Sequence, residues 1–137
     1  MSEIVIKSRR EDGLVRFLNM NDFNVEELEN EIFRVTRSDE IPVYLKVTET
    51  TLFFEVDLGS IKEIGTEELY FKLLEMNNEI LPVSFGVNNT NTDDPRLILV
   101  ESRECSDLDD HELLSVFDAL ELAVDRAEQL LQQWMKD

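Results

Sequence analysis

The sequence predicts an α+β protein in which helices cover an antiparallel β-sheet. Three observations indicate this class: a long amphipathic helix pattern at the C-terminal end, a middle region rich in β-branched and aromatic residues, and strands that are grouped between helices rather than strictly alternating with them. At 137 residues the chain has the length of one domain. We therefore expect residues 1–137 to form a single domain, with residues 1–7 as a loosely ordered or extended N-terminal segment.

The first predicted element is a helix over residues 8–20. Ser8 and Glu11 have the spacing of a capping box. In this motif the side chain of each residue accepts a hydrogen bond from the backbone N–H of the other. The apolar residues that follow share one helical face, namely Leu14, Phe17 and Leu18.

Residues 23–37 fit two patterns. In a helix, Asn24 would be the N-cap and Glu27 would complete a second capping box. In a hairpin, apolar positions alternate and place Phe33 and Val35 on one face. The hairpin needs fewer exceptions, because β-branched residues with alternating charge suit a half-buried strand. The sequence favours the hairpin, with a helix as the alternative.

The segment IPVYLKVTETTLFFEVDL predicts two antiparallel strands, at 41–48 and 51–57, separated by a break at Glu49-Thr50. Alternation places the first strand's residues on two faces: Val43, Leu45 and Val47 on one, and Tyr44, Lys46 and Thr48 on the other. We expect one face of the sheet to be covered and the other to be partly solvated.

A second helix is predicted to follow Thr66, whose hydroxyl suits an N-cap, with Glu67 and Glu68 in its first turn. Its expected buried side consists of Leu69, Leu73, Leu74 and Met76. Asn77-Asn78 should end the helix, and Pro82 prevents its continuation. Two more strands are expected at 82–87 and 96–101, joined by the polar loop NNTNTDDP.

The last element is a helix from Ser106 to the C-terminus, with overlapping N-cap candidates at Asp107, Asp109 and Asp110. Its apolar stripe has the spacing of a buried helix face: Leu113, Val116, Phe117, Leu120, Ala123, Val124, Ala127, Leu130, Leu131 and Trp134. The opposite face is acidic, with Glu112, Asp118, Glu121, Asp125 and Glu128 against one arginine, Arg126. Most of the stripe should cover the sheet.

The formal charge of −18 argues against direct binding to nucleic acid or anionic membranes, because such affinity depends on Lys and Arg. Cys105 is the only cysteine and cannot form an internal disulfide. The chain shows no signal-peptide pattern and no apolar run of membrane-spanning length. These features predict a cytoplasmic protein that does not insert into membranes.

No catalytic or cofactor motif stands out. Metal ligands could come only from acidic clusters such as SDLDDHE, where helix capping explains the aspartates better. His111 has no adjacent nucleophile or orienting acid that would indicate a general base. The four glycines form no phosphate-binding loop. We expect a non-enzymatic protein without cofactors.

Two apolar regions are candidates for partner binding. The first is the end of the C-terminal helix, with Leu130, Leu131, Trp134 and Met135, where the helix could extend past the core. The second is the sheet face on which we expect both Tyr44 and Phe54 to lie. In both places, covering the core is the competing interpretation.

The segments IPVYLKVTETTLFFEVDL and LYFKLLEMNNEILPVSFGV resemble the YjfI-type family of small bacterial proteins, in which a strand pair precedes a helix and a short proline-containing strand. The tail LILVESRECSDLDDHELLSVFDALELAVDRAEQLL resembles the closing strand and helix of type III secretion chaperones. That resemblance implies an acidic, cytosolic α+β protein that dimerises and holds an extended partner segment. It transfers no role to individual residues.

The leading hypothesis is an acidic, cytosolic protein-binding module with a chaperone-like or regulatory role, which shields a helical or extended apolar segment of a protein partner. A homodimer is compatible with this hypothesis. Two alternatives stay open: a phosphate mimic whose acidic last helix binds a basic protein, and a carboxylate-based enzyme or divalent-metal binder.

Overall fold

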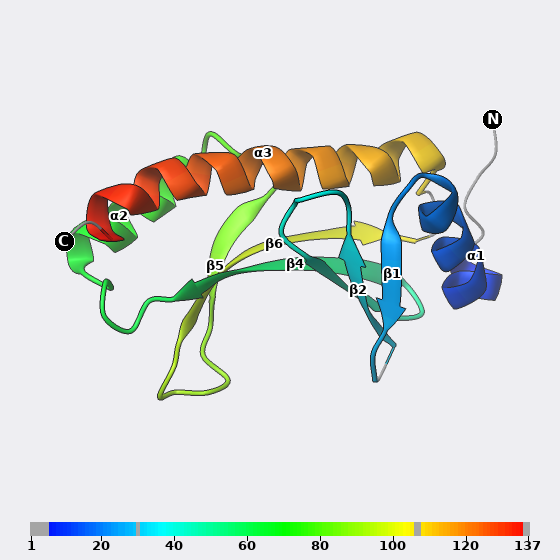
Figure 1. Cartoon of the computed structure of the whole chain (residues 1–137), viewed down its shortest axis with the longest axis horizontal. Helices are drawn as coiled ribbons and strands as arrows, with labels where there is room; N and C mark the ends of the chain where they lie inside the picture. The colour runs from blue at the N-terminus through cyan, green and yellow to red at the C-terminus, as the bar shows by residue number, and fades with distance from the viewer. Residues whose placement is uncertain (1–5, 30, 106–107, 136–137) are drawn as a thin grey trace. The chain divides into compact units, whose positions relative to one another are not determined.

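A computed structural model describes residues 6–29, 31–105 and 108–135, which form three helices and six strands (Figure 1). In chain order the elements are α1 (Ile6–Met20), β1 (Asn24–Glu27), β2 (Ile32–Thr36), β3 (Val43–Val47), β4 (Thr51–Ser60), α2 (Glu67–Met76), β5 (Ser84–Asn88), β6 (Arg96–Glu104) and α3 (Asp110–Met135). The strands form one sheet with the order β1-β2-β3-β4-β6-β5. The predicted α+β class, with an antiparallel sheet and a long C-terminal helix, is confirmed.

The chain divides into two compact units. The first holds the described residues of 1–56 and 101–116, and the second holds those of 57–100 and 117–137. The boundary between them passes through β4, β6 and α3, so the expectation of a single domain stays a prediction. Of the N-terminal segment predicted for 1–7, residues 6 and 7 belong to α1, and residues 1–5 lie outside the described part.

The direction of β4 and β6 follows from hydrogen bonds at their two ends. The N–H of Cys105, after β6, donates to the carbonyl of Thr50, before β4, at 2.9 Å. At the other end, the N–H of Ile61 donates to the carbonyl of Pro95 at 3.0 Å. The end of each strand therefore meets the start of the other, so they are antiparallel. The remaining neighbours are antiparallel by register, and β1 and β5 form the two edges.

β1 and β2 form the hairpin that the sequence favoured over a helix. Val25 pairs with Val35, and Glu27 pairs with Phe33. Phe33 and Val35 are 0% and 1% exposed, whereas three of the four residues of β1 are exposed. Burial of alternate residues in the hairpin therefore outweighs the local capping signals that favoured a helix.

β3 and β4 bury one face and leave the other partly solvated, as predicted. Leu45 pairs with Phe54 and Val47 with Leu52, and these four side chains are at most 1% exposed. β4 continues to Ser60 rather than ending at 57.

The predicted helix at 8–20 is present, but it begins earlier than predicted. α1 starts at Ile6, so Ser8 lies inside the helix and the predicted N-cap at this residue is wrong. Leu14 and Leu18 are buried, at 1% and 0% exposure, as their four-residue spacing requires.

α2 is capped as predicted, since the Thr66 hydroxyl accepts a hydrogen bond from the N–H of Leu69 at 3.1 Å. Leu69 and Leu73 are buried, whereas Leu74 is 67% exposed, so its predicted burial is wrong. Leu74 follows Leu73 by about 100° around the helix axis and therefore lies on a different face. Met76 is half-buried.

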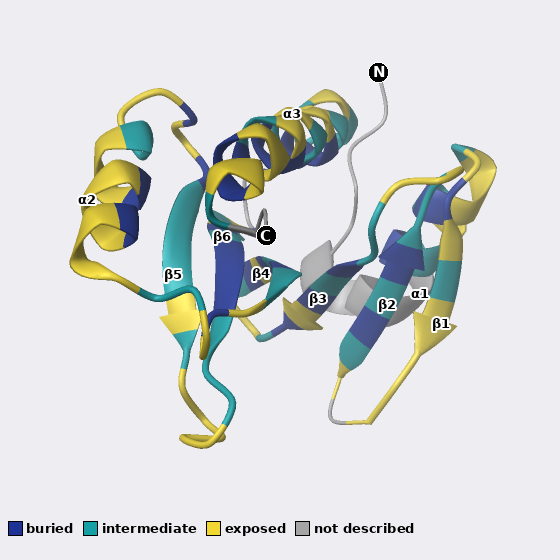
Figure 2. Ribbon diagram, turned by 60° about the vertical axis from the view of Figure 1, so that its left-hand side comes forward, coloured by how far each residue is buried: buried dark blue, intermediate teal, exposed yellow. Residues whose placement is uncertain are grey.

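A cluster of apolar residues forms the core of the second unit. It joins α2, β6 and the end of α3, and we call it the second-unit cluster: Ile61, Leu69, Leu73, Leu97, Leu130 and Leu131. Figure 2 shows these three elements with buried segments on their ribbons. The cluster therefore holds α2 in place beside the sheet within this unit.

α3 begins at Asp110, later than the predicted start at Ser106. Residues 106–107 and 136–137, at the ends of the predicted helix, lie outside the described part. Asp109 acts as the N-cap, because its carboxylate accepts a 2.8 Å hydrogen bond from the N–H of Glu112. The predicted stripe is confirmed: its residues from Leu113 to Leu131 are at most 8% exposed, and Trp134 is half-buried.

Candidate protein-binding site

Three of the four predicted binding residues at the end of α3 lie in or against the core of the second unit. Leu130 and Leu131 are 8% and 6% exposed and are part of the second-unit cluster, and Trp134 packs against it. The side chain of Met135 lies outside the described part. Partner binding by these residues stays a prediction, but Leu130 and Leu131 are not on the surface.

The second predicted pair, Tyr44 and Phe54, lies on opposite faces of the sheet. Phe54 is 1% exposed and pairs with Leu45 on the buried face, whereas Tyr44 is half-buried on the other face. The aromatic residue that shares the face of Tyr44 is Phe53, which is 45% exposed and pairs with Lys46. The sequence assignment was therefore displaced by one residue along β4, which reverses the face of a strand side chain.

An open apolar groove lies between α2 and β5 within the second unit. Its volume is about 230 Å³. Three residues of α2, three of β5 and one of β6 line it: Tyr70, Leu73, Leu74, Phe85, Gly86, Val87 and Leu97. Apart from the hydroxyl of Tyr70, every side chain that lines the groove is apolar, which is typical of a surface that binds an apolar partner.

Several groove residues expose much of their side chains to solvent. Leu74 is 67% exposed, Val87 52% and Tyr70 41%, and the neighbouring Phe71 is 65% exposed. The described residues contain other exposed apolar side chains, such as Leu122 at 66%, but this group combines exposure with a groove. The exposed side of α2 is therefore the candidate site.

The sequence contained a signal for this site. In α2, two apolar pairs, Leu69-Tyr70 and Leu73-Leu74, recur four residues apart, so the apolar arc is wider than one buried face needs. The first residue of each pair is buried and the second is exposed. The expected burial of Leu74 assigns the whole arc to the core, whereas an over-wide arc predicts a second, exposed contact face.

Gly65 positions the Tyr70 ring at the groove. A Cβ atom added at Gly65 would overlap the Tyr70 hydroxyl and would lie 2.8 Å from the carbonyl oxygen of Ile61. The N–H of Gly65 donates to the same carbonyl at 2.9 Å, which fixes the backbone there. The missing side chain at Gly65 thus leaves the space that the Tyr70 hydroxyl occupies.

β5 forms the other wall of the groove and is an edge strand. The N–H of Phe85 donates a 2.7 Å hydrogen bond to Oδ1 of Asn77, the C-cap of α2. This bond joins the end of α2 to β5 and occupies one outward-pointing backbone group of the edge.

Charged pairs hold the strand ends of this unit. Arg96 donates from Nε to both carboxylate oxygens of Asp57 at 3.2 Å and from Nη1 to Asp94 at 3.1 Å. Hydrogen bonds from the Ser60 hydroxyl and then from Arg96 hold the pKa of Asp94 below its ordinary value. The same carboxylates, Asp57 first, raise the pKa of Arg96.

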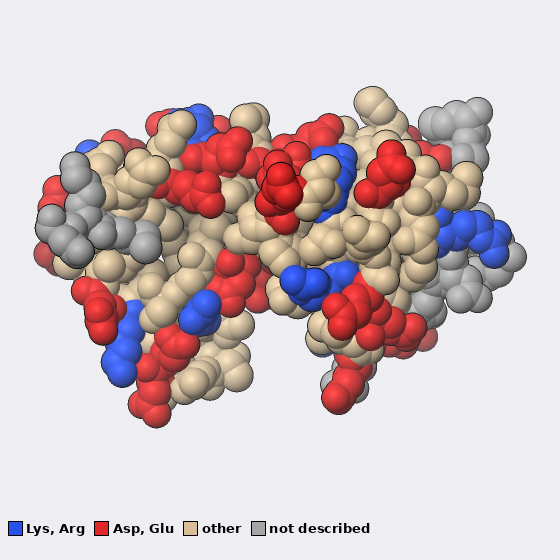
Figure 3. Space-filling model, viewed as in Figure 1, with Lys and Arg blue, Asp and Glu red and all other residues tan. Residues whose placement is uncertain are grey.

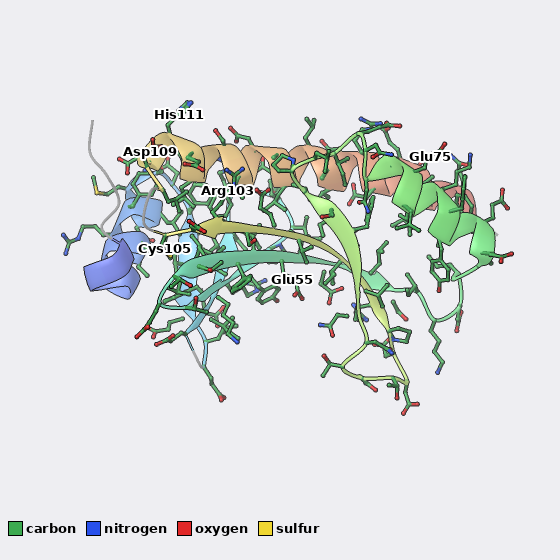
Figure 4. All side chains as sticks on the ribbon, turned by 180° about the vertical axis from the view of Figure 1, so that it is seen from behind. Glu55, Glu75, Arg103, Cys105, Asp109 and His111 are labelled. Carbon is green, nitrogen blue, oxygen red and sulfur yellow. The ribbon has the colours of Figure 1, made fainter. Side chains whose placement is uncertain are left out.

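A second charged network lies in the first unit, where Figure 4 labels Arg103. Nε of Arg103 donates to Glu101 and Nη1 donates to Glu112, each at 2.7 Å. The side chain of Glu101 is 2% exposed, and among the described residues its Oε1 has no hydrogen-bond partner. The network joins β6 to the first turn of α3.

The acidic cluster at the start of α3 shows capping geometry. Asp109 bonds the helix N-terminus, and Figure 4 shows His111 pointing away from the ribbon. Over the part of the chain that the structure describes, no three His, Cys, Asp or Glu residues are grouped as metal ligands. Within the same residues, each helix is too short or too polar to cross a membrane.

Comparisons with solved structures show the same fold in other proteins. One is the heterodimeric complex ExoU-SpcU from the type III secretion system of Pseudomonas aeruginosa, at 18% identity and a TM-score of 0.67, covering 84% of this chain and 94% of that one. Another is YbjN, a putative transcription regulator from E. coli, at 14% identity and a TM-score of 0.68, covering 87% and 91%. A third is the Yersinia pestis type III secretion chaperone SycH in complex with a stable fragment of YscM2, at 22% identity and a TM-score of 0.58, covering 85% and 95%.

A search of curated proteins gives no match. The resemblance to the YjfI-type family is not confirmed by these comparisons. The family model CesT_Tir_1, by contrast, matches residues 8–137, which is nearly the whole chain. The chain therefore belongs to the CesT_Tir_1 family of type III secretion chaperone-like proteins.

Proposed function

We propose that the chain is a non-enzymatic protein-binding module with a chaperone-like role, which holds an apolar segment of a partner polypeptide in the groove between α2 and β5. The observation that carries this proposal is the groove itself, with Leu74, Val87 and Tyr70 exposed at its walls. Burying such side chains against a partner is favourable by about 25 cal/mol per Å² of apolar surface.

The core behind the groove supports this role. Leu73 and Leu97 line the groove and also belong to the second-unit cluster, in which they pack with Leu130 and Leu131. The end of α3 would then act indirectly, by holding the floor of the groove in position. A rigid floor lowers the entropy cost of binding, because fewer side chains have to be ordered.

Two of the similar solved structures support a protein partner. SpcU was solved in a complex with ExoU, and SycH was solved with a fragment of YscM2. Their likeness to this chain shows the fold, and the groove supplies the separate reason to expect protein binding here.

The test is co-purification of the tagged full chain from its own cells, with Leu74→Glu as the groove variant. Leu122→Glu is a matched control, because Leu122 on α3 is 66% exposed, close to the 67% of Leu74, and does not line the groove. We expect the wild type and the control to recover the same specific polypeptide. Recovery should fall about tenfold with Leu74→Glu, because the introduced carboxylate would be buried in the complex without a partner.

Equal recovery with Leu74→Glu and the wild type would contradict the assignment of the groove. Light scattering on the same samples measures self-association. If Leu74→Glu abolishes a homodimer but leaves the recovered polypeptide unchanged, the groove is a contact between copies of this chain rather than a partner site.

A further inference from the structure

We propose that Tyr70 is the specificity-determining residue of this chain, an inference that rests on the function proposed above. Its ring is a fixed wall, seated in the space that the missing side chain of Gly65 leaves. The wall limits the occupant to an apolar side chain no larger than a single ring, such as leucine, and excludes the two-ring indole of tryptophan. Three features of the second unit support this role: the seat of the Tyr70 hydroxyl, the fixed start of α2 and the rigid floor beneath the ring.

The Tyr70 hydroxyl lies against the backbone of Gly65. Tyr70 lines the groove, whereas Gly65 does not. A Cβ atom added at Gly65 would overlap this hydroxyl and would lie only 3.0 Å from Cζ of the ring. A side chain at position 65 would therefore displace the ring. The hydroxyl is the single polar side-chain group among the lining residues, and its seat beside Gly65 leaves the apolar part of the ring as the wall.

Hydrogen bonds fix the backbone on both sides of this seat. The N–H of Gly65 donates to the carbonyl of Ile61 at 2.9 Å, before α2 begins. Within the first turn of α2, the N–H of Tyr70 donates to the Thr66 carbonyl at 3.0 Å and the N–H of Leu69 donates to the Thr66 hydroxyl at 3.1 Å. A tyrosine side chain has only two χ angles. With its backbone fixed and its hydroxyl seated, the ring has little freedom to swing aside.

The floor beneath the ring is rigid as well. Leu73 and Leu97 are 4% and 2% exposed and belong to the second-unit cluster. The other exposed α2 residue of the lining, Leu74, is 67% exposed, and exposed side chains change rotamer on the picosecond to nanosecond timescale. Of the two exposed walls that α2 supplies, Tyr70 is thus the one that cannot yield to a larger occupant.

These features make the groove select by size. None of its lining residues is charged, and its volume is about 230 Å³, while a cavity of about 150 Å³ suffices for benzene. One ring or one branched aliphatic side chain fits, whereas an indole would have to displace Tyr70, and overpacking of this kind is unfavourable. A second copy of this chain would bring another formal charge of −18 to the site, so charge complementarity favours a separate polypeptide as the source of the side chain.

The experiment uses the full chain and two small probes, N-acetyl-leucinamide and N-acetyl-tryptophanamide. NMR chemical shifts of the backbone amides of Gly86 and Val87, which line the groove, follow each titration. We expect a dissociation constant on the order of 1 mM for the leucine probe. The measured quantity is the ratio of the two dissociation constants. The wild type should prefer the leucine probe, and Tyr70→Ala should shift the ratio toward the tryptophan probe about tenfold.

Two control variants separate the wall from other effects of an aromatic residue on α2. Tyr70→Phe keeps the ring and should keep the wild-type ratio. Phe71→Ala removes a ring from the next residue, which is 65% exposed and does not line the groove, and should also leave the ratio unchanged. Thermal melting measures the stability of each variant separately, since a purely structural role for Tyr70 would alter stability without altering the preference between probes.

A double-mutant cycle tests the seat at Gly65. Gly65→Ala should push the ring into the groove and weaken binding of the leucine probe about tenfold. In the Tyr70→Ala background the same substitution should have no further effect, because no ring is left to displace. The added Cβ lies 2.8 Å from the Ile61 carbonyl oxygen in both backgrounds, so the difference between them isolates the ring.

Equal affinity of the wild type for the two probes overturns the inference, even if Tyr70→Ala fails to fold. An unchanged ratio in Tyr70→Ala has the same consequence, and so does the absence of binding by either probe. A homodimer that buries the groove and excludes both probes identifies a second copy as the occupant and also overturns the inference. Each result leaves the proposed function standing if Leu74→Glu still loses its polypeptide partner.

Discussion

Glu101 shows at the residue scale how one cation can support a buried carboxylate. Its side chain is 2% exposed, and Oε2 accepts a hydrogen bond from Arg103, whereas Oε1 has no partner within the part of the chain that the structure describes. A buried charge without its partner is strongly unfavourable, because the interior cannot replace its hydration. Arg103 also bonds Glu112, so one side chain stabilises two acidic residues.

Replacing Arg103 with methionine should therefore lower the free energy of unfolding by about 3–5 kcal/mol. Urea denaturation provides the measurement. Arg34→Met is the control, because the Arg34–Glu26 pair is 3.7 Å long and exposed, and such pairs contribute about 1 kcal/mol or less. Similar losses in the two variants would show that Arg103 does not compensate a buried charge.

Asp94 should make stability depend on pH in the acid range. Its pKa in the folded chain is lowered from 3.8 by hydrogen bonds from Ser60 and Arg96. A lowered folded-state pKa contributes stability that is complete above the unfolded-state pKa and is lost as pH falls through the folded-state value. Comparing the wild type with Asp94→Asn from neutral pH into acid should show a stability difference that shrinks below about pH 4. A constant difference would contradict this linkage.

At the element scale, neighbouring residues of α2 lie on two different faces of the helix, one buried and one exposed. Leu73 is 4% exposed and belongs to the second-unit cluster, whereas its neighbour Leu74 is 67% exposed. Leu73→Ala should cost about 2–5 kcal/mol of unfolding free energy, because it removes packed methyl groups. Leu74→Ala should change it by about 0.5 kcal/mol or less.

The same two alanine variants separate stability from binding. Thermal or urea unfolding gives the stability of each, and co-purification gives its partner binding. We expect Leu74→Ala to keep its stability and lose partner recovery. A large stability loss for Leu74→Ala would mean that this side chain packs inside the protein and that the exposed groove is not its environment.

At the scale of the whole molecule, net charge is the dominant sequence property. The formal charge is −18, and Figure 3 shows acidic side chains outnumbering basic ones on the face it presents. Like charges repel more strongly in the compact state than in the extended unfolded chain. Salt should therefore stabilise the folded protein.

Raising sodium chloride from about 0.01 M to about 0.15 M shortens the screening length from about 30 Å to about 8 Å, and we expect the melting temperature to rise. Potassium chloride at the same ionic strength is the control for an ion-specific effect and should give an equal shift. A melting temperature that is constant or falls with salt would show that attractive pairs, such as Arg96–Asp57, outweigh the net repulsion.

The fold class, most element positions and the buried stripe of α3 could be predicted from the sequence alone, because these depend on the 2.0- and 3.6-residue periods of apolar side chains. The sequence also predicted the Thr66 cap, which is a local hydrogen bond. Tertiary structure decided matters that local periodicity leaves open. Register placed Phe53 rather than Phe54 on the face of Tyr44, and packing of the second-unit cluster buried Leu130 and Leu131 while leaving Leu74 exposed.

The groove is also a feature that local periodicity could not predict, for a physical reason. Tyr70, Leu74 and Val87 become one surface only when α2 lies beside β5, and their separation in the chain hides this proximity. An apolar helix residue looks the same in the sequence whether it faces its own core or a partner, because both environments exclude water from it. Only the tertiary structure shows which apolar residues the core leaves uncovered.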